Sequence, residues 1–107
     1  MSVTAQQVSE SLLRLAETDA EHARKKARME GLEYLFKTVK ATEYLGASGT
    51  NGEREQKANA SKAYQDHAAK YEQAVLDFTA LDNERKTLIL TIDVWRSLNA
   101  NQRKGNI

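Results

Sequence analysis

The chain has 107 residues, with 16 basic and 15 acidic side chains, two histidines, and neither proline nor cysteine. This length fits one small domain, and the lack of cysteine excludes disulfides, thiolate catalysis and zinc–thiolate sites. The balanced charge excludes a strongly acidic mimic of nucleic acid and provides no overall basic field for nonspecific DNA binding.

The first half of the chain has the pattern of one long helix. Thr4 and Gln7 fit a capping box, in which their side chains bond the free backbone amides of the first turn. Apolar residues then recur at helical spacing, and no proline interrupts them: Val8, Leu12, Leu15, Met29, Leu32, Phe36 and Val39. These features predict a helix over residues 4–45.

A glycine-rich cluster predicts a turn at residues 46–52. Thr50 and Glu53 form a second capping box, which starts a helix predicted over residues 53–98. Spacings of three and four alternate along that helix, as in a coiled-coil seam, at Tyr64, His67, Tyr71, Ala74, Phe78, Leu81, Arg85, Leu88, Ile92 and Trp95. The polar residues 99–107 are expected to fray as a tail.

The short turn makes the two helices antiparallel neighbours. The predicted fold is therefore all-α, a single domain formed by a long hairpin that resembles a coiled coil. Centring the turn near Ser48 would pair Leu15 with Leu81 and Phe36 with Ala60.

A run of apolar residues near the end of the second helix covers more than one helical face. Alone, this β-branched run could be a buried strand, but it continues a long helical pattern without glycine or proline. A single partner helix cannot bury all of these residues, so we expect a homo-oligomer that completes a helical bundle. The run comprises Leu88, Ile89, Leu90, Ile92, Val94 and Trp95.

Small residues form a stripe on the first helix that would allow another helix to approach closely. Either packing within the chain or the seam of a dimer would explain the stripe. Its members are Ala16, Ala20, Ala23, Ala27 and Gly31.

Several features argue against catalysis. The hairpin register separates His22 from His67, so the two histidines cannot share a metal ion. The carboxylates are numerous, but two exposed helices offer no concave pocket that would shift their pKa values. No glycine-rich phosphate loop follows a strand. We therefore expect no enzyme, cofactor, metal or small-molecule substrate.

Two basic segments could bind a partner or nucleic acid. The first contains the cluster Arg24, Lys25, Lys26 and Arg28, within a segment, residues 24–40, of net charge +4. Residues 66–84 carry −4, so pairing between the helices is the leading explanation of this cluster and phosphate binding is the alternative.

The second basic segment, residues 85–104, also carries +4 and contains the only tryptophan. Basic residues that alternate with an aromatic side chain can hold single-stranded nucleic acid by charge and stacking. A tryptophan in the core or at an interface is the alternative. The candidate contact residues here are Trp95, Arg96, Asn99, Asn101, Arg103 and Lys104.

Two stretches of sequence are similar to a group of small bacteriophage proteins. Residues 94–106, Val-Trp-Arg-Ser-Leu-Asn-Ala-Asn-Gln-Arg-Lys-Gly-Asn, resemble the end of the long helix in that group, and residues 49–58 resemble its interhelical turn. Genes of this type often lie near phage replication and recombination genes. The resemblance implies an accessory role in phage DNA metabolism and carries over no activity.

Together these observations predict a non-enzymatic adaptor that binds a phage or host protein within a DNA-processing assembly. Direct nucleic-acid binding by the basic tail, and a helper role in phage morphogenesis, are the alternatives. No signal peptide and no apolar run of about 20 residues is found, so we expect no membrane association and a place in the host cytoplasm.

Overall fold

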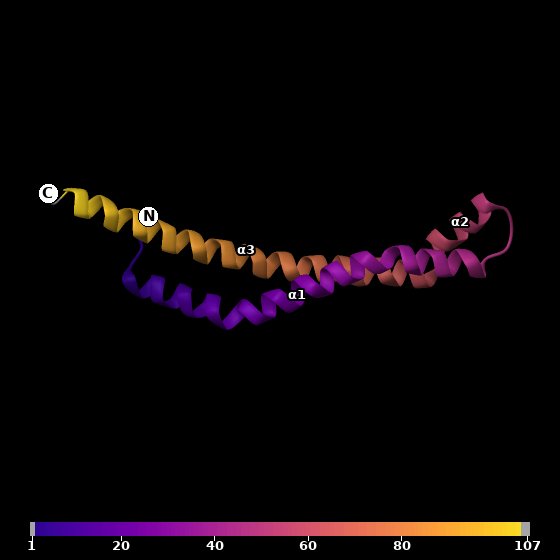
Figure 1. Ribbon diagram of the computed structural model, residues 1–107, viewed down its shortest axis with the longest axis horizontal. Helices are drawn as coiled ribbons and strands as arrows, with labels where there is room; N and C mark the ends of the chain where they lie inside the picture. The colour runs from indigo at the N-terminus through magenta and orange to yellow at the C-terminus, as the bar shows by residue number, and fades with distance from the viewer. Residues whose placement is uncertain (1, 106–107) are drawn as a thin grey trace. The chain divides into compact units, whose positions relative to one another are not determined.

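The computed structural model describes residues 2–105, and every regular element within them is an α-helix (Figure 1). Helix α1 spans Ala5–Gly46, α2 spans Asn51–Ala60 and α3 spans Lys62–Gly105. The all-α fold is thus confirmed. The apolar run from Leu88 to Trp95 is helical, so the strand alternative is excluded.

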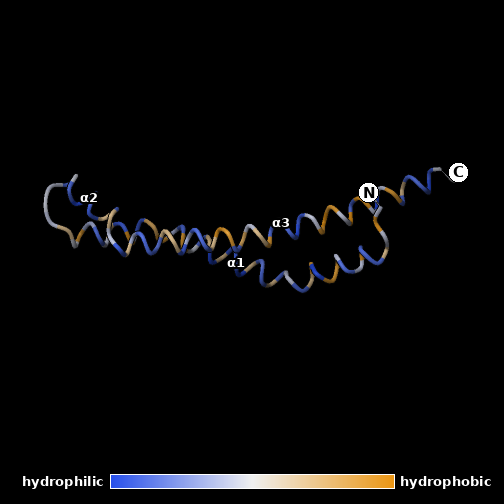
Figure 2. Tube along the Cα trace, turned by 180° about the vertical axis from the view of Figure 1, so that it is seen from behind, coloured by the Kyte–Doolittle hydropathy of each residue, from blue (hydrophilic) through white to orange (hydrophobic). Residues whose placement is uncertain are grey.

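The helices form two compact units, which we describe separately. The end unit contains α1 up to Ala23 and α3 from Thr79, and the turn unit is Arg24–Phe78. Within each unit, a segment of α1 packs against a segment of α3 that is distant in sequence, which confirms the antiparallel hairpin. Hydrophobic and hydrophilic residues alternate along both helices (Figure 2), as expected when one side of each helix is packed.

Both predicted capping boxes are present. The Gln7 amide donates to Thr4 Oγ1 at 3.2 Å, and the Thr4 amide donates to Gln7 Oε1 at 2.8 Å. The Glu53 amide likewise donates to Thr50 Oγ1 at 3.3 Å, while the Glu53 carboxylate accepts from the Thr50 amide at 3.4 Å. These bonds fix the first residues of α1 and α2.

Glycine is required at one position of the turn. Gly49 has a φ of 119°, a conformation that side chains with a Cβ rarely adopt. A Cβ at Gly49 would also collide with the Glu53 side chain of the capping box. By contrast, a Cβ at Gly46 would meet nothing within 4 Å.

The second helix departs from its predicted bounds in two places. Ser61 has extended backbone, with φ −62° and ψ 148°, and separates α2 from α3. Its hydroxyl donates to the Ala58 carbonyl at 2.7 Å and accepts from the Tyr64 amide at 3.2 Å, so it caps both helices. The prediction of one unbroken helix over 53–98 was therefore wrong. The expected frayed tail was also wrong as far as Gly105, where α3 ends; residues 106–107 lie outside the described residues.

A contact of Arg85 indicates how α1 and α3 are aligned in the end unit. Leu15 was predicted to pair with Leu81, and its carbonyl accepts from Arg85 Nη1 at 2.8 Å. Arg85 lies about one helical turn beyond Leu81.

The seam predicted on the second helix is confirmed, since all ten of its residues are buried or half-buried. The seam of α1 is more polar than predicted. Leu12 is 53% exposed, whereas Ser11 and Thr18 are buried. The packed side of α1 follows alternating spacings of three and four through Val8, Ser11, Leu15, Thr18, His22, Lys25, Met29, Leu32, Phe36 and Val39.

Aromatic side chains form the centre of the turn unit. The Phe36 ring packs edge-on against Tyr64, His67 and Tyr71, with centroid distances of 5.7, 4.7 and 5.3 Å. His67 is buried, and its Nε2 donates to the Leu32 carbonyl at 2.6 Å. His67 is therefore a packed seam residue with a satisfied ring nitrogen.

In the end unit, the arginine Arg85 makes the central contacts between α1 and α3. Arg85 Nη1 donates to Thr18 Oγ1 at 2.8 Å as well as to Leu15, and Nη2 lies 3.2 Å from Asp19 Oδ1. The Thr18 hydroxyl in turn donates to the Arg14 carbonyl at 2.8 Å. Among residues 2–105, no buried side-chain nitrogen or oxygen lacks a partner, so the polar seam carries no desolvation penalty from an unpaired group.

The small-residue stripe of α1 takes no part in this packing. All five of its members, Ala16, Ala20, Ala23, Ala27 and Gly31, are exposed. The interpretation that the stripe packs within the chain is therefore wrong, and the dimer seam stays a prediction.

Replacing Gly49 with alanine should destabilise the fold by about 1–3 kcal/mol, because the residue would be forced into a strained conformation beside the capping box. Urea unfolding of Gly49→Ala measures this loss. The matched control is Gly46→Ala, which should unfold at the same urea concentration as the parent or higher. Equal effects of the two substitutions would contradict the role assigned to Gly49.

Candidate interaction site at the end of helix α3

Ion pairs in the end unit join α1 to α3. Arg14 Nε lies 2.6 Å from Glu84 Oε1, and His22 Nε2 lies 2.9 Å from Asp82 Oδ1. The second oxygen of Asp82 accepts from Lys86 Nζ at 2.8 Å, one helical turn along α3. Asp82 therefore accepts from one basic side chain on each helix, His22 on α1 and Lys86 on α3.

These contacts keep the carboxylates ionised. Hydrogen bonds from Lys86, and then from His22, lower the pKa of Asp82 below its ordinary value. The hydrogen bond from Arg14 lowers the pKa of Glu84, and the same bond raises the pKa of Arg14. A general acid needs the opposite shift, so this cluster has the chemistry of a structural ion-pair network.

The two histidines belong to different units, His22 to the end unit and His67 to the turn unit. Among residues 2–105, no group of three or more histidine, aspartate and glutamate side chains could hold a metal ion. Each ring bonds a neighbour across its own unit, as described above.

Two acids of the acidic segment pair with residues of α1 that lie outside the basic cluster. Asp82 and Glu84, which belong to the acidic segment, pair with His22 and Arg14. Lys40, at the end of the basic segment, pairs with Glu55 at 3.2 Å, outside the acidic segment. Within the cluster, Arg24, Lys26 and Arg28 are exposed and Lys25 is half-buried on the seam.

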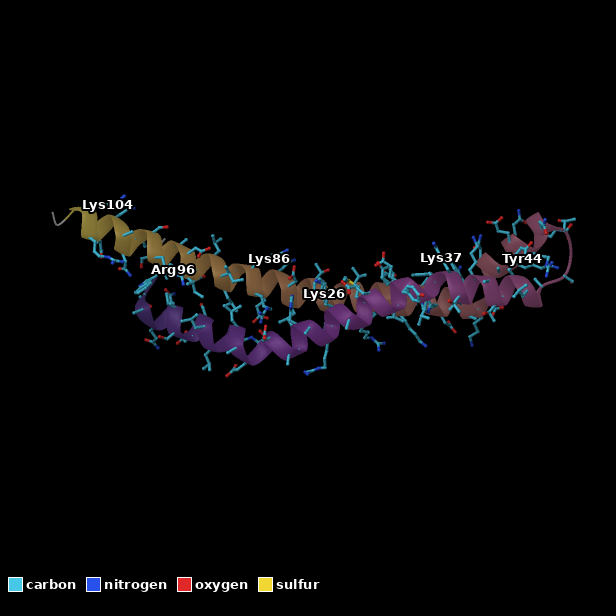
Figure 3. All side chains as sticks on the ribbon, in the orientation of Figure 1. Lys26, Lys37, Tyr44, Lys86, Arg96 and Lys104 are labelled. Atoms are coloured by element: carbon cyan, nitrogen blue, oxygen red, sulfur yellow. The ribbon has the colours of Figure 1, made fainter. Side chains whose placement is uncertain are left out.

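A hollow of about 430 Å³ lies near the end of α3. Its lining consists of Trp95, Arg96, Asn99, Gln102 and Arg103. The indole of Trp95 is half-buried, so this residue is neither a core tryptophan nor a fully exposed one. Figure 3 labels Arg96 and Lys104 on these last turns of α3.

The hollow continues the seam face of α3. Trp95, Asn99 and Gln102 follow Ile92 at the alternating spacings of three and four that mark the packed side of this helix. Ile92 is buried, whereas the next seam positions become more exposed as α3 approaches Gly105.

The exposure increases because α1 begins too late to cover this part of α3. The contacts of Leu15 with Arg85 and of Arg14 with Glu84 indicate the antiparallel register, which brings Ala5, the first residue of α1, within about one helical turn of Trp95. Ser2 and Val3 line a different hollow, together with Leu88 and Thr91. Beyond Trp95, the seam face of α3 therefore has no helix against it among residues 2–105.

The structure brings together four of the six contact residues proposed from the sequence. Trp95, Arg96, Asn99 and Arg103 share the hollow, whereas Asn101 and Lys104 do not line it. Gln102 was missed, although its spacing of seven residues from Trp95 was a usable signal of the shared helical face.

The basic end of α3 also has a structural explanation. Arg103 and Lys104 lie in the last turn of the helix, where the free carbonyl groups give the helix dipole its negative end. Basic side chains at this end stabilise the helix, so their charge alone does not indicate a nucleic-acid site.

No known protein family, curated protein or solved structure was found to match the chain. Within the residues that the structure describes, no helix is both long enough and apolar enough to cross a membrane.

Acid should weaken the end unit through Asp82 and Glu84, whose pKa values are lower in the folded chain than their ordinary values. A carboxylate with a depressed pKa stabilises the fold above its unfolded-state pKa, and this contribution is lost as the pH falls through the folded-state pKa. The melting temperature should thus be steady near neutrality and fall below about pH 4.

Circular dichroism melts across this pH range measure the effect. Asp82→Asn and Glu84→Gln should each be less stable near neutral pH and show a shallower fall in acid. Glu72→Gln, at an exposed site, is the control and should keep the slope of the parent. Parent-like slopes in both test variants would show that these ion pairs do not couple to folding.

Proposed function

We propose that the protein is a non-enzymatic interaction module that holds a macromolecular partner against the seam face of α3 between Trp95 and Arg103. One observation carries this proposal: a helix face with coiled-coil spacing continues past the helix that covers it, and the uncovered part contains a half-buried tryptophan and two arginines. Tryptophan and arginine are the residue types most enriched where binding energy is concentrated in protein interfaces.

The resemblance to phage proteins supports a biological role for this module. The stretch that resembles the phage proteins, residues 94–106, includes the part of the seam face that α1 does not cover. An accessory adaptor in phage DNA replication or recombination, acting in the host cytoplasm on a phage or host protein, is the role that we propose.

Direct binding of nucleic acid is the second candidate, and the hollow itself favours it. Trp95 could stack on a base while Arg96 and Arg103 contact phosphates. Two features weigh against it: the net charge of the chain is only +1, and the carbonyl end of α3 repels phosphate.

We also propose that the module self-associates through surfaces of the end unit away from the hollow. Leu90 is 61% exposed and Leu13 is 60% exposed, and exposed apolar side chains of this size can be buried in an interface. Burial of such side chains contributes about 25 cal/mol per Å². The exposed apolar side chains of this unit are Leu12, Leu13, Ile89, Leu90 and Leu98.

Site-specific photo-crosslinking tests the interaction module. A crosslinking residue at Asn99, which lines the hollow, should give a discrete adduct in cells that naturally make the protein. The same residue at Asn83, exposed elsewhere on α3, is the matched control and should not give that adduct. An adduct that survives nuclease identifies a protein partner, and one that nuclease removes favours the second candidate. No adduct at Asn99, or equal adducts at both sites, would contradict the proposed function.

Sedimentation equilibrium tests self-association. The parent chain should sediment as a dimer or larger assembly at micromolar concentration, and Leu90→Glu should shift it toward the monomer because a charge would be buried in the interface. Thr79→Glu, at another exposed position of α3, should leave the assembly intact. A parent chain that sediments as a monomer would refute this part of the proposal.

A further inference from the structure

We infer that the partner held at the end of α3 is an acidic, amphipathic α-helix of another protein, which lies along α3 where α1 no longer covers it. This inference rests on the proposed function and specifies the class of partner. It follows from the spacing of the uncovered residues, from their charge, and from the contacts that α1 and α3 already make in the same unit.

The spacing indicates a helix as the occupant. Trp95, Asn99 and Gln102 continue the repeat of three and four that packs α3 against α1 at Leu81, Leu88 and Ile92. A helix surface with this repeat accepts the side chains of a second helix between its own. The two amides would also favour one register, because polar residues at seam positions pair specifically.

The charge indicates an acidic occupant. Arg96 and Arg103 are seven residues apart, so they lie on the same flank of the seam. Neither forms an ion pair with a carboxylate within residues 2–105. In the covered part of the end unit, arginines do meet acids: Arg14 meets Glu84 on the facing helix, and the seam residue Arg85 meets Asp19. A partner helix that supplies carboxylates would complete the same arrangement.

A second copy of the chain fits this surface poorly. If two such helix ends packed antiparallel about a two-fold axis, Arg96 of one copy would face Arg96 or Arg103 of the other copy. Like charges on facing flanks of a coiled coil disfavour pairing. The self-association proposed above therefore uses other surfaces, and the hollow remains available for a different protein.

Nucleic acid also fits less well than a helix. A phosphate chain would gain from Arg96 and Arg103, but it would lie close to the negative carbonyl end of α3. It would also leave the coiled-coil spacing of Asn99 and Gln102 without a function. The spacing of the uncovered residues is that of a helix seam, and the positive charge of Arg96 and Arg103 favours an anionic helix as the partner.

Tryptophan fluorescence gives a direct measurement, because Trp95 is the only tryptophan of the chain and lines the hollow. The probes are two synthetic helical peptides of roughly two heptads each. Both have leucine on the seam; one has glutamate on the flanks and the other has lysine. We expect the glutamate peptide to bind and to shift Trp95 emission to shorter wavelength, and the lysine peptide to bind at least about tenfold more weakly.

Charge reversal provides the decisive variants. Arg96→Glu combined with Arg103→Glu should reverse the preference, so that the lysine peptide binds more tightly than the glutamate peptide. Lys104→Glu is the matched control, because Lys104 lies in the same last turn as Arg103 but outside the hollow. It should keep the preference of the parent. Circular dichroism melts verify that each variant is folded.

Three outcomes would overturn the inference. The first is an unchanged peptide preference in the double variant, and the second is an equal change in Lys104→Glu, which would indicate nonspecific charge. In the third, a single-stranded DNA oligonucleotide shifts Trp95 emission at physiological salt while neither peptide does. If Asn99 still crosslinks to a protein in cells while the glutamate peptide fails to bind, the proposed function stands and only the helical partner is rejected.

Discussion

The structure depends on a single row of side chains repeated at spacings of three and four along α1 and α3. Two helices share only this seam, so few side chains are fully enclosed by the fold. The buried apolar residues are Val8, Ala58, Ala74, Leu81 and Ile92. Several seam positions of α1 are polar, and they are compatible with packing because each finds a partner. Arg85, bonded to Leu15 and Thr18 across the end unit, shows how a charged side chain can occupy the place of a leucine.

The candidate site follows from the same constraint. Nothing about its backbone is unusual, since it is the seam face of α3 continued beyond the point where α1 begins. Thr4 caps α1 there, and α3 continues to Gly105. The residues that would be interior in a longer hairpin, with Trp95 first among them, are therefore presented to solvent. A binding surface of this kind needs no cleft, because the partner helix supplies the second side of the seam.

The polar contacts of the end unit divide into two kinds. Asp82 and Glu84 are already paired with basic side chains of the chain itself, and the lowered pKa of each reflects that pairing. Arg96 and Arg103 have the same chemistry as Arg14, but neither forms an ion pair with a carboxylate among residues 2–105. This contrast within one unit is the physical basis for expecting an acidic partner, and it separates groups that hold the fold together from groups available for recognition.

The sequence alone determined the helical fold, the turn, both capping boxes and the packed side of α3, because these follow from local spacing and from hydrogen bonds within one helical turn. It also pointed to Trp95, Arg96, Asn99 and Arg103. Only the tertiary structure revealed the break at Ser61, because its cap lacks the usual acidic residue three positions later. Only the tertiary structure decided how α1 and α3 align in the end unit, because that alignment depends on contacts between residues far apart in sequence. The register in turn decided which residues α1 covers. Gln102 lines the hollow while Asn101 and Lys104 do not, which the spacing of seven residues from Trp95 could have indicated. Polar seam residues such as Thr18 were found only once their partners were visible.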